Sequence, residues 1–176
     1  DRAVARLAFS GGPLAMIGAW IDGIDAAMMR ALPAEALAGL SIRERIRRLV
    51  QFRLDAVAGR EEAVRRALAI LAMPRNAAVA LRRGWRSADL MWRLAGDTAS
   101  DYNHYTKRTI LAGVYAATLA AFIDDESAGK AETAQFLDRR IAGIIRFEKA
   151  KSRLVPPPGK HFSLTRFLGR LRYPAR

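Results

Sequence analysis

The sequence contains no cysteine and only two histidines, His104 and His161. Without cysteine there is no disulfide bond, thiolate metal site or cysteine nucleophile. The two histidines lie far apart, and neither belongs to a His-x-x-x-His or Glu-x-x-His pair, the spacings by which helices hold metal ions. A glycine-rich phosphate loop and the serine turn of hydrolases are also missing. These absences predict a protein that is not an enzyme and has no metal or other cofactor.

Long hydrophobic runs and acidic residues are also scarce. No uncharged stretch exceeds the 15 residues of Thr109–Ile123, whereas a helix needs about 20 apolar residues to span a bilayer. We therefore expect this stretch to be a buried helix. The 30 Lys and Arg residues outnumber the 17 Asp and Glu residues, and the net charge of +13 favours acidic lipid headgroups, nucleic acid or an acidic protein as partners.

Helical periodicity dominates the 176 residues, of which 51% are hydrophobic. Ser41 followed by Glu44 is a capping box, the signature of a helix start. Asp97, Ser100 or Asp101 is expected to cap a later helix, and residues 124–126 are interpreted as a solvated acidic loop. Glycine and proline separate the expected helices. These helices cover about residues 2–9, 13–32, 42–58, 60–73, 76–94, 102–123 and 131–151.

The most unusual segment is residues 85–108, which hold two of the three tryptophans and two of the four tyrosines. Trp85, Asp89 and Trp92 are spaced i, i+4 and i+7, so they share one face of a helix. An aromatic face of this kind either belongs to the core or forms an exposed surface for a partner protein. The spacing alone leaves both interpretations open.

This segment also carries a resemblance to a known family. W-R-L-A-G-D at 92–97, S-D-Y-N at 100–103 and Y-T-K-R at 105–108 closely resemble the ubiquinone-biosynthesis accessory lipid-binding family, the ninth coenzyme-Q protein and its bacterial relatives. F-L-D-R-R-I at 136–141 also looks like that family. The resemblance covers roughly residues 13–150 and is most specific over 89–141.

The resemblance implies an all-α, TetR-like helical bundle. Residues 1–33 would then be the remnant of a helix-turn-helix-like module with a truncated start, and 34–152 a helical lipid-binding domain. Residues 153–159, which are rich in proline, would be a linker to a C-terminal amphipathic helix at 160–176. TetR-like proteins commonly form homodimers through their last two domain helices, so we expect a homodimer.

The resemblance further implies that the protein docks on the di-iron demethoxyubiquinone hydroxylase around the W-x-x-A-G-D segment. The candidate partner-binding residues either match the family's motif or lie beside residues that match it. They are Asp89, Met91, Trp92, Asp97, Tyr102, Asn103, Tyr105 and Arg108.

The bound ligand would be an isoprenoid quinone or a related isoprenoid lipid. The helix at 109–123 is rich in alanine and glycine, and such small residues either permit close packing or leave room for a ligand. An isoprenoid chain needs an apolar cavity because it has no polar group to satisfy. The candidate lipid-binding residues are Leu111, Val114, Tyr115, Thr118, Leu119 and Phe122.

Residues 160–176 combine apolar and basic side chains and contain no acidic residue. This composition is typical of a helix that lies on an anionic membrane surface, although a last helix docked on the core would show a similar pattern. The candidate membrane-binding residues are Phe162, Leu164, Phe167, Leu168, Arg170 and Leu171. We expect a peripheral protein of the cytoplasmic face of a bacterial inner membrane or, alternatively, of the matrix face of the mitochondrial inner membrane.

Two rival functions remain. The fold and the basic charge also suit a TetR-type transcription regulator. A recognition helix reads DNA with basic and polar side chains, however, and the N-terminal stretch offers few of them. Nucleic acid is therefore not the expected partner. The second rival is an enzyme that acts on quinone precursors, for which the sequence offers no catalytic constellation.

Overall fold

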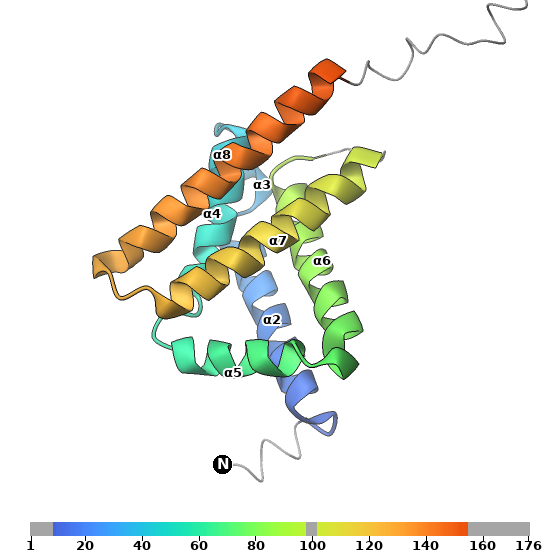
Figure 1. Cartoon of the computed structure of the whole chain (residues 1–176), viewed down its shortest axis with the longest axis vertical. Coiled ribbons are helices and arrows are strands. Elements are labelled where there is room, and N and C mark those ends of the chain that lie inside the picture. The colour runs from blue at the N-terminus through green and yellow to red at the C-terminus, as the bar shows by residue number, and fades with distance from the viewer. Residues whose placement is uncertain (1–8, 98–101, 155–176) are drawn as a thin grey trace, which may run out of the picture. The chain divides into compact units, whose positions relative to one another are not determined.

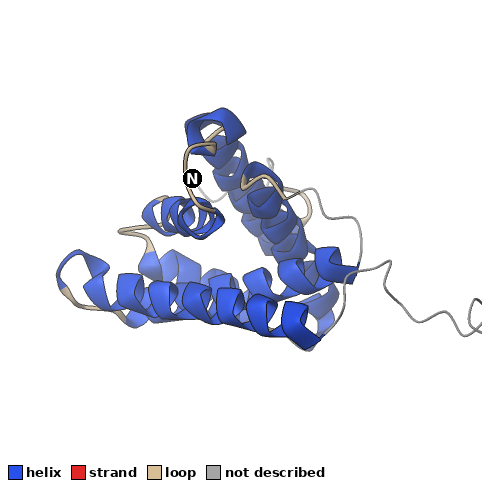
Figure 2. Ribbon diagram, turned by 90° about the horizontal axis from the view of Figure 1, so that it is seen from above, coloured by secondary structure: helices blue, strands red, loops and turns tan. Residues whose placement is uncertain are grey.

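The computed structural model describes residues 9–97 and 102–154, without the side chains of residues 102–104, 145 and 147–154. These residues form α-helices and two short 3-10 helices, and there is no strand among them (Figures 1 and 2). The expected all-α class is thereby confirmed. The elements are α2 (Gly12–Ala31), α3 (Ala34–Leu37), α4 (Ile42–Asp55), α5 (Glu61–Leu71), η1 (Pro74–Asn76), α6 (Ala77–Leu94), α7 (Tyr102–Asp124), η2 (Ala128–Lys130) and α8 (Ala131–Leu154).

The helix starts and stops follow local sequence signals. Pro13 stands in the first turn of α2, where its missing N–H costs no helical hydrogen bond. The hydroxyl of Ser41 accepts a hydrogen bond from the backbone N–H of Glu44 at 3.3 Å, which confirms the expected cap of α4. Gly59 has a positive φ of 75° in the turn after α4, a conformation that glycine adopts without steric penalty.

The helices up to residue 142 form one compact unit, and the rest of α8 belongs to a second. Within the first unit, α2 packs against α4, α5 and α6, and α6 packs along α7 (Figure 1). Ile46, Leu49, Val50 and Leu54 of α4 are buried in this core, and each large apolar side chain that is buried contributes about 1.5–3 kcal/mol. The fully buried aliphatic side chains are Met28, Leu37, Leu49, Val50, Leu54, Met91 and Leu111.

The segment between α7 and α8 differs from its interpretation as a solvated loop. Asp125 is buried, with only 7% of its surface exposed. Its carboxylate accepts hydrogen bonds from the backbone N–H and hydroxyl of Ser127 and from the N–H and hydroxyl of Thr133, all between 2.5 and 2.8 Å. These hydrogen bonds lower the pKa of Asp125 well below its ordinary value. Asp125 therefore organises the start of α8, whereas Asp124 and Glu126 are exposed.

Over the described ranges, no helix combines the length and the apolar character needed to cross a bilayer. The expectation that Thr109–Ile123 is a buried helix is only partly right: Leu111, Thr118 and Phe122 of α7 are almost completely buried, whereas Gly113, Ala117 and Ala120 on its other side are exposed.

Candidate functional site

The W-R-L-A-G-D string forms the C-terminal end of α6. The N–H of Gly96 donates to the carbonyl of Arg93, and the N–H of Asp97 donates to the carbonyl of Trp92, both at 2.9 Å. This pair of hydrogen bonds is a Schellman motif, which requires a left-handed residue after the helix. Gly96 supplies that residue with a φ of 87°. The motif turns the chain so that Asp97 faces α7.

The side chain of Asp97 is 8% exposed and is held by two cations of α7. Lys107 Nζ lies 2.8 Å from Oδ1 of Asp97, and Arg108 Nη1 lies 3.1 Å from Oδ2. Arg108 also reaches Asp89 through its Nε at 2.5 Å. The carboxylate of Asp97 is therefore held by two basic side chains of α7. Ser100 and Asp101, the other residues expected to cap this helix, lie outside the described residues.

Hydrogen bonds from Lys107 and Arg108 stabilise the ionised form of Asp97. Burial by itself would raise the pKa of this carboxyl, but the two cations outweigh that effect and the pKa is lowered below its ordinary value. The indole N–H of Trp92 donates to the carbonyl of Lys107 at 3.0 Å, and Lys107 Nζ lies 5.4 Å from the centre of the Trp92 ring. The turn after α6 and the first part of α7 are therefore joined by one charged cluster.

Burial divides the expected partner-binding residues into two groups. Met91, Trp92 and Arg108 are 0%, 6% and 1% exposed, so their side chains cannot themselves reach a partner in this conformation. The open question of the aromatic face is thus answered for Trp92, which belongs to the core. Asp89 is 22% exposed in its side chain and Tyr105 is 62% exposed. The side chains of Tyr102 and Asn103 lie outside the described residues.

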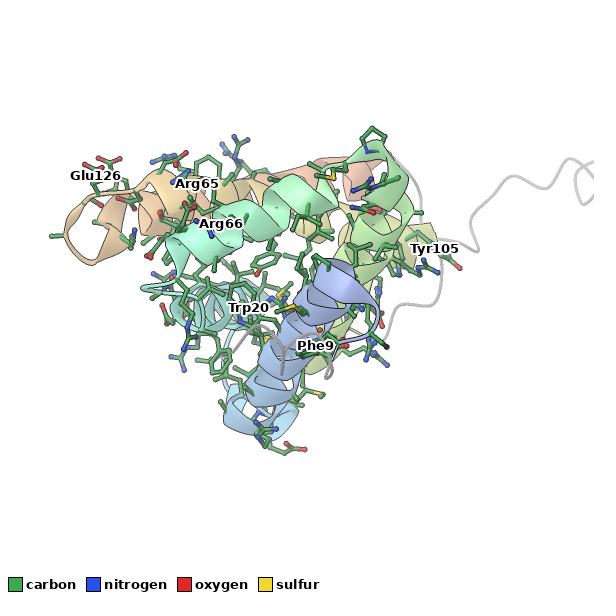
Figure 3. All side chains as sticks on the ribbon, turned by 90° about the horizontal axis from the view of Figure 1, so that it is seen from below. Phe9, Trp20, Arg65, Arg66, Tyr105 and Glu126 are labelled. Atoms are coloured by element: carbon green, nitrogen blue, oxygen red, sulfur yellow. The ribbon has the colours of Figure 1, made fainter. Side chains whose placement is uncertain are left out.

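The residues that do reach the surface lie on α6 and at the start of α7. Leu81 is 74% exposed, and the ring centres of Trp85 and Tyr105 lie 5.8 Å apart. Leu81, Trp85 and Asp89 are spaced by four residues, so they follow one face of α6. We call Leu81, Trp85, Asp89 and Tyr105 the α6 face; Tyr105 is labelled at its edge in Figure 3. Leu81 was missed by the sequence analysis because an exposed leucine has no sequence signal.

Arg45 is a second residue that the sequence did not single out. Its guanidinium donates to the carbonyls of Leu40, Ala95 and Ala38 at 2.8, 2.9 and 2.6 Å. One side chain therefore joins the segment before α4 to the last turn of α6. A Cβ at Gly96 would lie 2.9 Å from Nη1 of Arg45, which is a second reason for glycine in the W-x-x-A-G-D string.

A cavity of about 380 Å³ lies among α2, α4, α5, α6 and α7. Its wall is predominantly apolar, and it includes Ala80 and Gly84 of α6 and Ala112 and Ala116 of α7. These small residues leave the space open, so the interpretation that they make room for a ligand agrees with the geometry. The volume lies toward the lower end of the range of small-molecule sites.

The cavity contains two of the six expected lipid-binding residues, Tyr115 and Leu119. Leu111, Thr118 and Phe122 are buried but do not line it, and Val114 does not line it either. Only one face of α7 borders the cavity, and Tyr115 and Leu119 lie on it. The other expected residues lie on faces of α7 that do not border the cavity. Residues of α2 and α5 supply much of the remaining wall, among them Ile17, Trp20, Ile21, Ile24, Val64, Ala67, Leu68 and Leu71.

One part of the cavity wall is polar. Arg53 is 2% exposed and forms an ion pair with the buried Asp25, whose Oδ2 also accepts a hydrogen bond from Ser87 at 3.1 Å. The guanidinium carbon of Arg53 lies 4.8 Å from the centre of the Tyr115 ring. Burial opposes the charge of Arg53, but Tyr115 and Asp25 outweigh it and the pKa of Arg53 is raised above its ordinary value.

A second, more open hollow of about 570 Å³ lies between α2 and α5. It shares Ile17, Trp20 and Ala67 with the cavity, so the two spaces adjoin. Trp20 on α2 and Arg66 on α5 both line the hollow and are labelled in Figure 3. The further lining residues are Pro13, Met16, Glu62, Ala63 and Ile70.

The expected membrane-binding residues of 160–176 all lie outside the described residues. Within the described part of the chain, no group of histidine and acidic side chains is arranged to hold a metal ion.

Part of the chain is similar to proteins of one known family. Residues 77–148 match the family model of COQ9. The mitochondrial ubiquinone biosynthesis protein COQ9 of Rattus norvegicus is 42% identical over 76 residues, which are 43% of this chain and 24% of the relative. The mitochondrial coq9 protein of Dictyostelium discoideum is 27% identical over 138 residues, 78% of this chain and 44% of its own length. The chain thus spans less than half of the curated relatives that it matches.

The fold has a neighbour among solved structures. A TetR transcriptional regulator from Nitrosomonas europaea aligns with a TM-score of 0.59 and 24% sequence identity, over 72% of this chain and 69% of the regulator. The TetR-like fold expected from the sequence is thereby confirmed, as is the resemblance to the COQ9 family over residues 77–148.

Proposed function

We propose that the chain, whose residues 77–148 match the COQ9 family model, is a non-enzymatic accessory protein of ubiquinone biosynthesis. In this proposal it binds isoprenoid quinone intermediates at a membrane surface and presents them to the di-iron demethoxyubiquinone hydroxylase. The names of the relatives support the pathway. The cavity among α2, α4, α5, α6 and α7 is the observation that carries the ligand-binding part.

The chemistry of the cavity suits an isoprenoid ligand. Its walls are mainly aliphatic, and each methylene group that leaves water contributes about 0.8 kcal/mol to binding. The cavity and the adjoining hollow, at about 380 and 570 Å³, together offer more room than a ring headgroup alone requires. A prenylated ring could therefore occupy both spaces.

Mass spectrometry of small molecules extracted from the purified protein tests this ligand. The source should be a host that makes ubiquinone, and we expect an isoprenoid quinone or its precursor to be recovered. A lipid-free protein would contradict the ligand part of the proposal.

Gly84 offers a matched pair of variants for the same experiment. It lines the cavity, and a Cβ at this position would meet no atom within 4 Å. We expect Gly84→Leu to fill the cavity and to abolish recovery of the lipid. Gly84→Ala adds a single methyl group and should retain the lipid, which separates filling of the cavity from any general effect of a side chain on α6.

The α6 face is the proposed docking surface for the hydroxylase. It combines the exposed Leu81 with the neighbouring, mutually tilted rings of Trp85 and Tyr105, and aromatic side chains are enriched at protein interfaces. We expect Leu81→Asp and Tyr105→Ala to weaken capture of the purified hydroxylase without changing thermal stability by more than a few degrees. Met29, an exposed apolar residue of α2, provides the control Met29→Asp, which should leave capture unchanged.

The proposed membrane contact rests on the composition of residues 160–176. Binding to vesicles that contain anionic lipid should be lost when these residues are deleted, and it should weaken with increasing salt. Peripheral attachment to the cytoplasmic face of a bacterial inner membrane, or to the matrix face of the mitochondrial inner membrane, follows from the same proposal; the relatives are named mitochondrial. Unchanged vesicle binding by the shortened chain would contradict it.

The TetR-like fold also suits a second candidate function, that of a transcription regulator. Salt-dependent binding to duplex DNA at physiological ionic strength would favour that function. Both candidates are compatible with a homodimer, which sedimentation equilibrium of the full chain measures directly.

A further inference from the structure

The connection between α5 and α6 exposes a cluster of apolar side chains. Met73 is 39% exposed and Leu81 is 74% exposed, and they are two of the six exposed large hydrophobic side chains of the described residues. We call residues 72–82 the α5–α6 corner; it includes η1 and lies where the green end of α5 turns into α6 in Figure 1. A cluster of exposed apolar side chains, unlike a single one, marks a contact site for a protein or a membrane. The exposed apolar residues of the corner are Ala72, Met73, Pro74, Ala77, Ala78 and Leu81.

Hydrogen bonds of a buried residue hold the corner in this position. The side-chain amide of Asn76 donates to the carbonyl of Ile70 at 2.7 Å, and its backbone N–H donates to the carbonyl of Met73 at 2.8 Å. Asn76 is 5% exposed, and α6 begins at the next residue. Asn76 thus joins the end of α5 to the start of α6, and the turn that presents Met73 to solvent is a fixed part of the fold.

The corner also carries positive charge that the fold does not balance. Residues 63–88 contain six arginines and no acidic residue. Arg75 and Arg82 are exposed, and neither forms an ion pair with another of the described residues. The next two arginines of α6 share one carboxylate, that of Asp22, which lies 3.5 Å from each. Cations without a protein partner therefore stand beside the exposed apolar side chains.

We propose that the α5–α6 corner is a membrane-contact surface for an anionic lipid bilayer. Met73 and Leu81 enter the outer part of the hydrocarbon layer, while Arg75 and Arg82 bind the headgroup phosphates. Arginine suits this place because its methylene stem covers apolar surface while its charged end stays at the polar level, and because the guanidinium pairs with phosphate through two hydrogen bonds. This contact is separate from the one proposed for residues 160–176.

The pairing of apolar and basic side chains favours a bilayer over other polyanions. Arg82 follows Leu81 directly, and Nη2 of Arg75 lies 3.5 Å from the sulfur of Met73. Each large apolar side chain of the corner thus has an arginine beside it. Nucleic acid would bind the arginines through its phosphates but offers no hydrocarbon for Met73 and Leu81. An anionic bilayer presents phosphate groups directly above hydrocarbon, which matches both kinds of side chain.

The corner adjoins the cavity described above. Leu71, Ala72 and Ala80 line that cavity, and Ala72 is also exposed at the corner. Contact of the corner with a bilayer would therefore bring the edge of the cavity to the membrane, which is the source of the lipid in the proposed function. The contact itself does not depend on lipid binding in the cavity.

Two pairs of substitutions in the full chain test the contact. Met73→Gln with Leu81→Gln removes the apolar side chains, and Arg75→Gln with Arg82→Gln removes the charges. Flotation with vesicles of phosphatidylcholine and phosphatidylglycerol gives the partition coefficient, and the hydroxylase is left out because Leu81 also belongs to the α6 face. We expect each pair to lower the coefficient on the order of tenfold, since one loses the transfer of apolar surface and the other the attraction to anionic lipid. Unchanged partitioning of both pairs would overturn the inference.

The end of α2 and the start of α4 provide a control of matched composition. Met29 and Ile42 are each 44% exposed, and Arg30 and Arg43 are exposed as well. Met29→Gln with Ile42→Gln, and Arg30→Gln with Arg43→Gln, should leave the partition coefficient nearly unchanged. Losses as large as those of the corner variants would show that only total charge and apolar surface matter, and would overturn the inference. Thermal unfolding verifies that every variant is folded.

The absence of cysteine from the chain allows a second measurement that locates the contact directly. Met73→Cys, labelled with an environment-sensitive dye, should show blue-shifted emission on the anionic vesicles, whereas Met29→Cys with the same dye should not. A label at position 73 that stays in water while the protein floats with the vesicles would overturn the inference and leave residues 160–176 as the membrane contact. A shift that requires the hydroxylase would assign the corner to a protein interface instead. A full chain that does not float at all would overturn both membrane proposals.

Discussion

Nη1 of Arg108 lies 3.1 Å from Oδ2 of Asp97, and this buried ion pair joins the turn after α6 to α7. The two residues are 11 positions apart and both belong to the strings that match the COQ9 family. Their side chains face each other because the Schellman motif at Gly96 reverses the chain. The ion pair between Asp97 and Arg108 therefore stabilises the position of the α6 face relative to α7.

Loss of Arg108 should destabilise the fold. Arg108→Met removes the buried cation between Asp97 and Asp89 but leaves Lys107 beside Asp97 and Arg93 beside Asp89, so we expect a loss of about 1–3 kcal/mol. Urea unfolding measures the change. Lys107→Met is the control with a smaller expected loss, because Lys107 is 22% exposed and Asp97 would keep Arg108. A larger loss for Lys107→Met than for Arg108→Met would contradict this arrangement.

Trp92 should act through the core and not through direct contact with a partner. Trp92→Ala is expected to lower the free energy of unfolding by about 3–5 kcal/mol, because it leaves a cavity. Trp92→Phe keeps most of the buried surface but leaves the carbonyl of Lys107 without its donor, for which we expect about 1–3 kcal/mol. If Trp92→Ala unfolds at the same urea concentration as the parent, the assignment of Trp92 to the core is wrong.

Glycine-to-alanine substitutions inside α6 and just after its C-terminal end should change stability in opposite directions. Gly96→Ala is expected to destabilise the protein by about 1–2 kcal/mol, because φ is 87° and the new Cβ would lie 2.9 Å from Arg45. Gly84 lies inside α6 with open space around it, so Gly84→Ala should stabilise by about 0.5–1 kcal/mol through helix propensity. Differential scanning calorimetry of the two variants compares them, and shifts of the same sign would refute the contrast.

Stability should fall in acid. Asp97 and Asp125 have pKa values lowered by hydrogen bonds in the fold, so protonation favours the unfolded chain. Their contribution is fully present above the unfolded pKa of about 3.9 and is lost as the pH falls through the lower, folded values. The free energy of unfolding, measured with urea between pH 7 and pH 3, should therefore be constant near neutral pH and decrease below about pH 4.5.

Asp125→Asn tests the origin of that decline. It should be less stable than the parent at pH 7, because an amide accepts the hydrogen bonds from Ser127 and Thr133 less well, and its stability should depend less on acid. Glu126→Gln is the control, since Glu126 is an exposed neighbour in the same turn. An identical acid dependence for the parent and Asp125→Asn would show that Asp125 does not contribute.

Several elements were predictable because their causes are local. Helical periodicity, the Ser41 cap, Pro13 and the glycines set the helix boundaries to within a few residues. The strings around Trp92 and Tyr105 were sufficient to identify the family resemblance. The small residues of α7 left both close packing and free space open, and two of them, Ala112 and Ala116, line the cavity.

The tertiary structure alone decided which face of each helix is buried. Trp92 and Tyr105 belong to the same matched segment, yet one is in the core and the other on the surface, because α6 and α7 cover only one side of each other. The cavity depends on the volume that five helices leave unfilled, a quantity that no single periodicity contains. Asp25, Arg53 and Ser87 come from three helices, and the sequence could not bring them together since charge pairing across a core is set by the packing of distant segments.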